Sequence, residues 1–287
     1  MRLNAYGNAG ENENMNILNL MKGLIQRMFV PNDIKTALGV IPAITDTMCE
    51  RMKLWSEMYA GDAEWTTDAV RSLRIEQGIV RELANISVSE MTAEVSVPQL
   101  NDALQSALRE INNRFQAGLA TGTMIIKPLP DMSVQYLPQT AFIPVEYDTR
   151  GRLVKVIFPE TKKSGDAYFT RLEYHSLDKN GLTITNRAYI SYSKGELGRE
   201  TALSALPEWQ PIAPAVTYPK MTRPVFGYYR NPIDNTIDGS FAGVSVFESA
   251  VDLIRRTDMQ FGRLDWEFES GERAIHVDPA ALRLEGK

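Results

Sequence analysis

Few residues in this sequence have the types and spacing that catalysis requires. Asp265 and Glu269 lie four residues apart, so a helix would place them on one face as paired carboxylates for acid–base chemistry or for a divalent metal. Ser191 and Lys194 match a Ser-x-x-Lys spacing, but none of the motifs that accompany it in enzymes occurs. The sequence also lacks a phosphate-binding glycine loop and a Gly-x-Ser-x-Gly nucleophile motif. We therefore predict that the protein is not an enzyme.

Residues that bind metals or form disulfides are equally sparse. The sequence has one cysteine, Cys49, and two histidines, His175 and His276, which is too few for the common Cys- and His-based metal sites. His175 lies near Glu173 in a segment with strand-like alternation, and we expect the two side chains on opposite faces of that strand. A solvated or inter-strand histidine is therefore expected rather than a general base. We predict no metal site and no cofactor.

Charge and composition argue against a protein that wraps nucleic acid. The formal net charge is −5 and the isoelectric point is about 5.3, so no basic face dominates. A protein through which DNA only passes is compatible with this charge, because an acidic wall repels phosphate. No apolar run approaches the roughly 20 residues of a membrane helix, and the N-terminus lacks a signal-peptide core. We expect a product that is cytoplasmic when made and has no membrane partner.

Apolar residues recur at helical spacing in the first third of the chain. Residues 1–14 are polar and rich in Asn and Gly, which predicts a disordered tail, and Met15 is a possible native start. Residues 15–29 are predicted to form a short amphipathic helix docked on its own domain. The apolar stripe of this helix consists of Ile17, Met21, Leu24 and Met28.

Three longer helices are predicted next. The first runs from about Thr45 to Tyr59 and ends near Gly61, and the second covers roughly 69–95. The apolar residues in register on the second are Ile75, Ile79, Leu83 and Ile86.

The third of these helices has sequence signals at both ends. Ser96 and Gln99 match a capping box, Pro98 suits the first turn, and Gly118 is a natural C-terminal stop. The predicted buried face consists of Leu100, Leu104, Leu108, Ile111 and Phe115.

Short segments rich in β-branched and aromatic residues begin after Gly122. Turn sequences at 148–151, 162–166 and 178–181 separate neighbouring segments. Because links this short join antiparallel neighbours, we predict an antiparallel β meander. The predicted strands cover 123–129, 133–137, 141–148, 152–160, 168–177 and 182–191.

The region after the meander is predicted to be irregular before one further strand. Prolines between Pro207 and Pro224 favour an ordered connection without regular structure. Residues 224–231 read as a strand, and 231–243 read as a loop.

A long amphipathic helix is predicted from Val246. Ser245 and Glu248 match a capping box, and Gly271 is the expected end. Several apolar residues recur every seven positions, which favours contact with neighbouring helices along the whole length. An ordinary helix that covers the sheet would explain the same spacing. The residues predicted to pack in this heptad pattern are Phe247, Ile254, Phe261, Leu264 and Phe268.

Several blocks of the sequence, in order, resemble the portal proteins of tailed double-stranded DNA bacteriophages, of the kind found in siphophages of Gram-positive hosts. The blocks include GLATGTMIIKP, TAFIPVEYDTRGRLVKVIFPE, YFTRLEYH, RPVFGYYRNP and GVSVFESAVDLIRRTDMQFGRLDWEFESGERAIHVD. The resemblance runs from about Met15 to Asp278. Within it, FAGVSVF departs from the Leu or Ile that usually precedes Gly-Val-Ser in the family.

The resemblance implies a structural role and an α+β fold. Portal proteins form dodecameric rings at one capsid vertex, and double-stranded DNA is packaged and ejected through the ring. The implied partners are other copies of the chain, the terminase motor, the major capsid and scaffolding proteins, and a head–tail adaptor. The implied location is the virion, with the host cytoplasm during assembly.

The family architecture suggests a division of this chain. It predicts N-terminal helices and the meander as the portal wing, then the first stem helix, which leans on its copies around the channel. The division is a tail at 1–14, a wing-like domain at 15–232, a loop and first stem helix at 233–271, and the start of a clip-like region at 272–287. Portals usually continue with a clip, a returning stem helix and a crown, so we expect a truncated or degenerate copy.

Polar residues of the stem helix are the candidates for the channel or the subunit interface. They are Glu248, Asp252, Arg255, Arg256, Gln260, Arg263 and Glu267. Two other functions stay open: a metal-dependent DNA-processing enzyme that uses Asp265 and Glu269, and another head–tail connector component.

Overall fold

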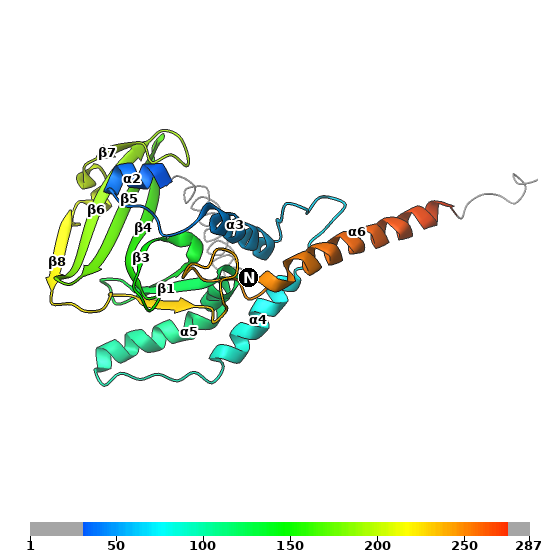
Figure 1. Ribbon diagram of the computed structural model, residues 1–287, viewed down its shortest axis with the longest axis horizontal. Coiled ribbons are helices and arrows are strands. Elements are labelled where there is room, and N and C mark those ends of the chain that lie inside the picture. The colour runs from blue at the N-terminus through cyan, green and yellow to red at the C-terminus, as the bar shows by residue number, and fades with distance from the viewer. Residues whose placement is uncertain (1–30, 275–287) are drawn as a thin grey trace, which may run out of the picture.

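The computed structural model describes residues 31–274, which form an α+β fold of two antiparallel sheets with helices packed beside them (Figure 1). The predicted fold class is therefore correct. The predicted tail at 1–14, the predicted helix at 15–29 and residues 275–287 lie outside the described residues.

Helix α3, Asp46–Ala60, has the ends that its sequence predicts. Thr45 caps it by accepting a hydrogen bond from the Met48 amide at 3.1 Å. Gly61 ends it with a φ of 76°, a left-handed conformation that favours glycine. Before it lies the short helix α2, Pro31–Leu38, whose Ala37 carbonyl accepts hydrogen bonds from strand residues Arg187 and Tyr189.

Helix α4, Ile75–Val88, is shorter than the predicted 69–95. Residues 61–74 form a loop instead, and Arg74 precedes the helix in a left-handed conformation with a φ of 55°. The predicted apolar register holds for its first two residues, since Ile75 and Ile79 pack against the core, but Ile86 is 75% exposed. The residues that α4 buries are Glu76, Val80 and Ala84.

Helix α5, Pro98–Thr121, differs from its prediction at both ends. Val97 occupies the N-cap position and no side chain caps it, so the predicted Ser96–Gln99 box is absent. The helix passes through Gly118 and ends at Gly122, which has a φ of 96°. Gly118 is needed for close packing instead, because an added Cβ would lie 2.8 Å from the Cβ of Met124. Of the predicted buried face, only Phe115 is fully buried.

The predicted strands exist, but they form two sheets instead of one meander. The break falls at the 3₁₀ turn Gln139–Ala141, where the side chain of Gln139 lies 2.7 Å from the hydroxyl of Thr123. The smaller sheet has the order β2–β1–β9, and the larger has the order β3–β4–β5–β6–β7 with β8 also paired to β6. The strands are β1 Thr123–Pro128, β2 Val134–Pro138, β3 Ile143–Tyr147, β4 Leu153–Ser164, β5 Ala167–Asp178, β6 Gly181–Ser191, β7 Arg199–Thr201, β8 Ala215–Pro219 and β9 Gly227–Arg230.

Strand β8 lies inside the proline-rich stretch that was predicted to be irregular. Its pairing with β6 runs from Thr185 opposite Ala215 to Gly181 opposite Pro219. The strand forms at the sheet edge, where proline is tolerated.

The main hydrophobic core joins distant parts of the chain. It includes Met48 and Trp55 of α3 and continues to Phe247 and to Ile254 of the last helix within residues 31–274. That helix, α6, covers Val251–Ala274. It thus begins later than the predicted Val246 and passes through the predicted stop at Gly271 to include residues 272–274.

Candidate functional site

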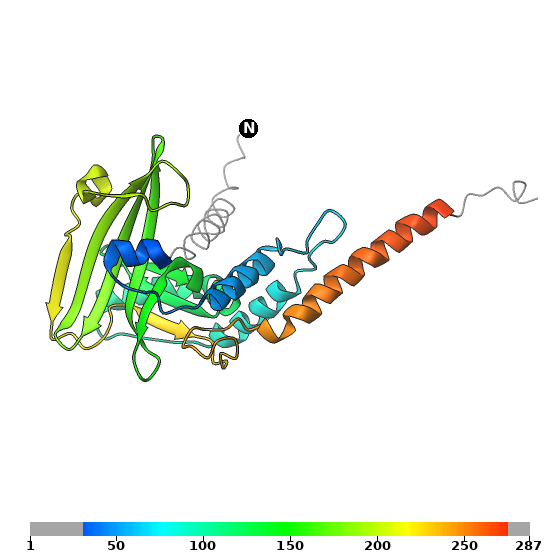
Figure 2. The same ribbon diagram turned by 45° about the horizontal axis from the view of Figure 1, so that its top comes forward.

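The candidate site is α6, which extends away from both sheets and from α3, α4 and α5 in the two views (Figures 1 and 2). A 3₁₀ turn, Glu248–Ala250, precedes it. Glu248 does not cap the helix as predicted. Its carboxylate pairs with Arg51 and accepts a hydrogen bond from the Trp55 indole at 2.5 Å, so it anchors the root of α6 to α3.

One stripe of α6 faces the body of the protein. Val251, Ile254, Asp258 and Gly262 are all buried and recur at intervals of three and four residues, as one helical face does. Gly262 permits the closest approach, because a Cβ there would lie 2.6 Å from the carbonyl oxygen of Ala69. The loop 61–74 therefore packs directly on α6.

Asp258 joins this loop to the helix by hydrogen bonds. One carboxylate oxygen accepts from the Trp65 indole at 3.0 Å, and the other accepts from the Leu73 amide at 2.9 Å. Burial raises the pKa of the neighbouring Glu76 above its ordinary value, and the charge of Asp258 raises it further. Sequence reasoning missed Asp258, although its position in the apolar interval pattern was a usable signal.

A second stripe of α6 is apolar and has no cover. Leu253 is 68% exposed and Phe268 is 67% exposed, and Phe261 and Leu264 between them are exposed as well. With Thr257, these residues follow intervals of four, four, three and four, so they share one face. Of the predicted heptad positions, Phe247 and Ile254 pack into the protein's own core, whereas Phe261, Leu264 and Phe268 do not.

A third stripe carries the charged and polar candidates. Asp252, Arg256, Gln260, Arg263 and Glu267 are exposed and repeat the same intervals, one position before the apolar stripe. Arg255 is exposed near the body, with its guanidinium carbon 5.8 Å from the Trp65 ring centroid. Of the seven predicted candidates, only Glu248 is engaged with the body by an ion pair.

The part of α6 from 263 to 271 is largely exposed to solvent. Every residue from 263 to 269 is exposed, including Trp266, Asp265 and Glu269. Within residues 31–274, no group of three or more His, Cys, Asp or Glu side chains lies close enough to hold a metal ion.

A buried ionic cluster lies elsewhere, where the two sheets meet. Glu173 of β5 pairs with Lys127 of β1 at 2.7 Å and with Arg171 at 3.3 Å. The ring of His175 lies 2.6 Å from the same carboxylate. The predicted placement of Glu173 and His175 on opposite faces is wrong, because residues two apart in a strand share a face.

The charges of this cluster stabilise the contact between the two sheets. Burial raises the pKa of Glu173, but the His175 hydrogen bond and the Lys127 charge outweigh it and lower the pKa to about 2. Lys127 also lies 4.6 Å from the Phe158 ring centroid. The ion pair of Lys127 and Glu173 joins β1 to β5, and this structural role accounts for the buried charges without a bound substrate.

No protein-family model matches the chain, and no curated protein is significantly similar to it. Among the helices within residues 31–274, none is both long and apolar enough to cross a membrane.

Proposed function

We propose that this chain is a subunit of a phage portal, a ring through which double-stranded DNA enters and leaves a capsid. The observation that carries the proposal is the exposed apolar stripe of Leu253, Phe261, Leu264 and Phe268 on a helix that extends away from the two sheets. Exposed apolar surface of this kind marks a protein contact. The ordered sequence blocks that resemble portal proteins support the same function.

In this proposal α6 is the first stem helix, and its apolar stripe and its charged stripe contact different surroundings. The apolar stripe packs on the next copy around the ring, since a seven-residue period keeps neighbouring helices in contact. The charged stripe faces the channel or solvent. Its two acidic and two basic residues, Asp252, Glu267, Arg256 and Arg263, balance, so DNA meets no strongly attractive wall.

The proposed partners follow from this role. They are further copies of the chain in a dodecameric ring, the terminase motor, the capsid and scaffolding proteins, and a head–tail adaptor. The proposed location is the portal vertex of the virion.

The proposal is tested by the assembly state of the complete gene product. Electron microscopy is expected to show closed rings with a central hole. Replacing Phe261 and Leu264 together by serine should shift the particles toward monomers, because the apolar contact is lost. The matched control replaces Arg256 and Arg263 by alanine on the charged stripe and should leave the rings intact. A stable monomer at high concentration, or rings that survive the Phe261/Leu264 change, would overturn the proposal.

A further inference from the structure

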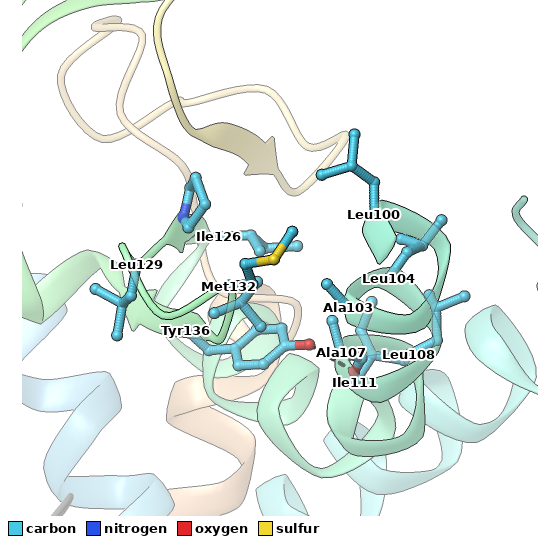
Figure 3. Close-up of a pocket in the computed structure, with 12 residues that line it drawn as sticks. Leu100, Ala103, Leu104, Ala107, Leu108, Ile111, Ile126, Leu129, Met132 and Tyr136 are labelled. Atoms are coloured by element: carbon cyan, nitrogen blue, oxygen red, sulfur yellow. Dashed lines mark hydrogen bonds between the residues drawn. The ribbon is translucent and has the colours of Figure 1, made fainter. Parts of the chain in front are cut away.

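Two features of the body are not explained by the role of α6 as a stem helix. One is an apolar groove between α5 and the hairpin of β1 and β2, and every residue that lines it is uncharged (Figure 3). It contains no carboxyl, amino or imidazole group whose charge changes near neutral pH. The other is a pair of buried carboxyl groups where the loop 61–74 meets α6. Glu76 and Asp258 are each 1% exposed.

The end of the loop connects these two carboxyl groups. The Ser72 hydroxyl donates to one oxygen of Glu76 at 3.5 Å, and the next residue, Leu73, donates its amide to Asp258 at 2.9 Å. Arg74 follows in a left-handed conformation with a φ of 55°, and its amide donates to the Ser72 hydroxyl at 3.1 Å. Three consecutive residues thus link the first turn of α4 to the first half of α6, so a movement at Glu76 reaches Asp258 directly.

Glu76 lacks the partners that a buried carboxylate requires. Its second oxygen is buried and has no hydrogen-bond partner among the described residues. A carboxylate in such a position is costly, whereas the neutral acid costs much less. The geometry therefore favours the protonated form.

The charged groups around Glu76 act in the same direction on balance. Burial raises the pKa of Glu76 above its ordinary value of 4.5, and Asp258 of α6 raises it as well. The amide of Glu76 itself, the Arg74 charge and the Ser72 hydroxyl lower the pKa, but they do not cancel the increase. Glu76 thus keeps its proton to a higher pH than an exposed glutamate does.

We propose that protonation of Glu76 controls how firmly the loop 61–74 holds α6. The neutral carboxyl group fits the buried position and leaves the Leu73 amide bound to Asp258. Loss of the proton to bulk solvent creates a second negative charge beside Asp258, and this charge requires water. The turn formed by residues 72–74 then moves outward, the Leu73–Asp258 hydrogen bond breaks, and α6 is held less firmly.

The direction of the pH dependence follows from the sign of the shift. The pKa of Glu76 is higher in the folded protein than in the unfolded chain. Its contribution to stability is therefore complete below pH 4.5 and is lost as the pH rises through the folded-state pKa. The inference concerns a single copy of the chain, so it does not rest on the portal proposal.

The test is hydrogen–deuterium exchange of the full chain between about pH 5 and pH 8, corrected for the intrinsic pH dependence of amide exchange. Protection of 61–74 in the wild type is expected to fall with rising pH by on the order of tenfold, the typical effect of losing a hydrogen bond to a charged group. Protection of 115–121, the buried end of α5, should stay constant.

Two variants assign this change to one carboxyl group. Glu76→Gln is neutral at every pH, so the protection of its loop should not depend on pH. The matched control is Glu82→Gln, which removes an exposed carboxylate from the same helix and should behave like the wild type.

Several results would overturn the inference. They are a wild-type loop whose protection does not change with pH, a pH dependence that persists in Glu76→Gln, and an equal loss of protection in 61–74 and 115–121. If Glu76→Gln does not fold, carbon NMR of the wild-type Glu76 carboxyl group decides the question. Its titration must follow the loss of loop protection, and a titration over a different pH range would refute the inference.

Discussion

At the scale of residues, Glu173 holds the two sheets together through its charge. Its pKa is lowered from 4.5 to about 2, so its contribution to stability is present above pH 4.5 and is lost as the pH falls toward 2. Glu173→Gln should cost about 3–5 kcal/mol at pH 7, because Lys127 and Arg171 lose a buried partner. Urea denaturation at several pH values measures this cost.

The difference between wild type and Glu173→Gln should shrink as the pH falls toward 2, because both side chains are then neutral. Glu146→Gln, which removes the half-exposed partner of Lys155, is the control and should cost less than about 1 kcal/mol. A Glu173→Gln cost that is independent of pH would contradict the assignment.

Asp258 is the residue on which the placement of α6 depends. Asp258→Ala leaves the Trp65 indole and the Leu73 amide without acceptors, which should lower the free energy of unfolding by about 2–4 kcal/mol. Hydrogen exchange in 61–74 should rise with it. Asp252→Ala, on the exposed face of the same helix, should change stability by less than roughly 0.5 kcal/mol. Equal effects of the two substitutions would show that the loop does not depend on Asp258.

At the scale of elements, two glycines of α6 should respond oppositely to alanine. Gly271→Ala meets no atom within 4 Å and should stabilise the helix by up to about 1 kcal/mol. Gly262→Ala places a Cβ 2.6 Å from the Ala69 carbonyl and should destabilise by about 1–3 kcal/mol. Thermal unfolding compares the two, and stabilisation by both would mean that the loop does not pack on α6.

Local patterns predicted most of the longer helices and strands but not their partners, and they missed α2, β7 and β8. The strands were found because alternation and turn residues are properties of neighbouring positions. Their division between two sheets follows from which strands pair, and the break at the 3₁₀ turn Gln139–Ala141 is not visible in the alternation of either flanking segment.

The same limit applies to α6. Its length and amphipathic character were predicted, but the stripe that meets the body was not. That choice depends on Asp258 and its partners Trp65 and Leu73, which are 193 and 185 residues away in sequence. The heptad pattern predicted packing at Phe261 and Phe268, and it could not show that the protein's own domain leaves both side chains exposed.

At the scale of the whole molecule, the net charge predicts how strongly the protein binds DNA. The net charge is −5, and the charged stripe of α6 is balanced. Duplex DNA is therefore expected to bind weakly, with little dependence of the binding constant on salt concentration. Fluorescence anisotropy with a labelled duplex at several ionic strengths measures this slope. A steep slope would reveal several phosphate contacts and contradict a conduit through which DNA slides.

The contacts of α6 with the rest of the protein lie in its first half, so its second half can act as a lever. Up to residue 271, Gly262 is the last buried residue of α6, and the remaining 12 residues of the helix reach roughly 18 Å farther. A rotation of only about 10° at the root would move the tip by about 3 Å over that length. A movement of loop 61–74 that tilts α6 would therefore displace Phe268 farther than the loop itself, because Asp258 links the loop to the first half of the helix.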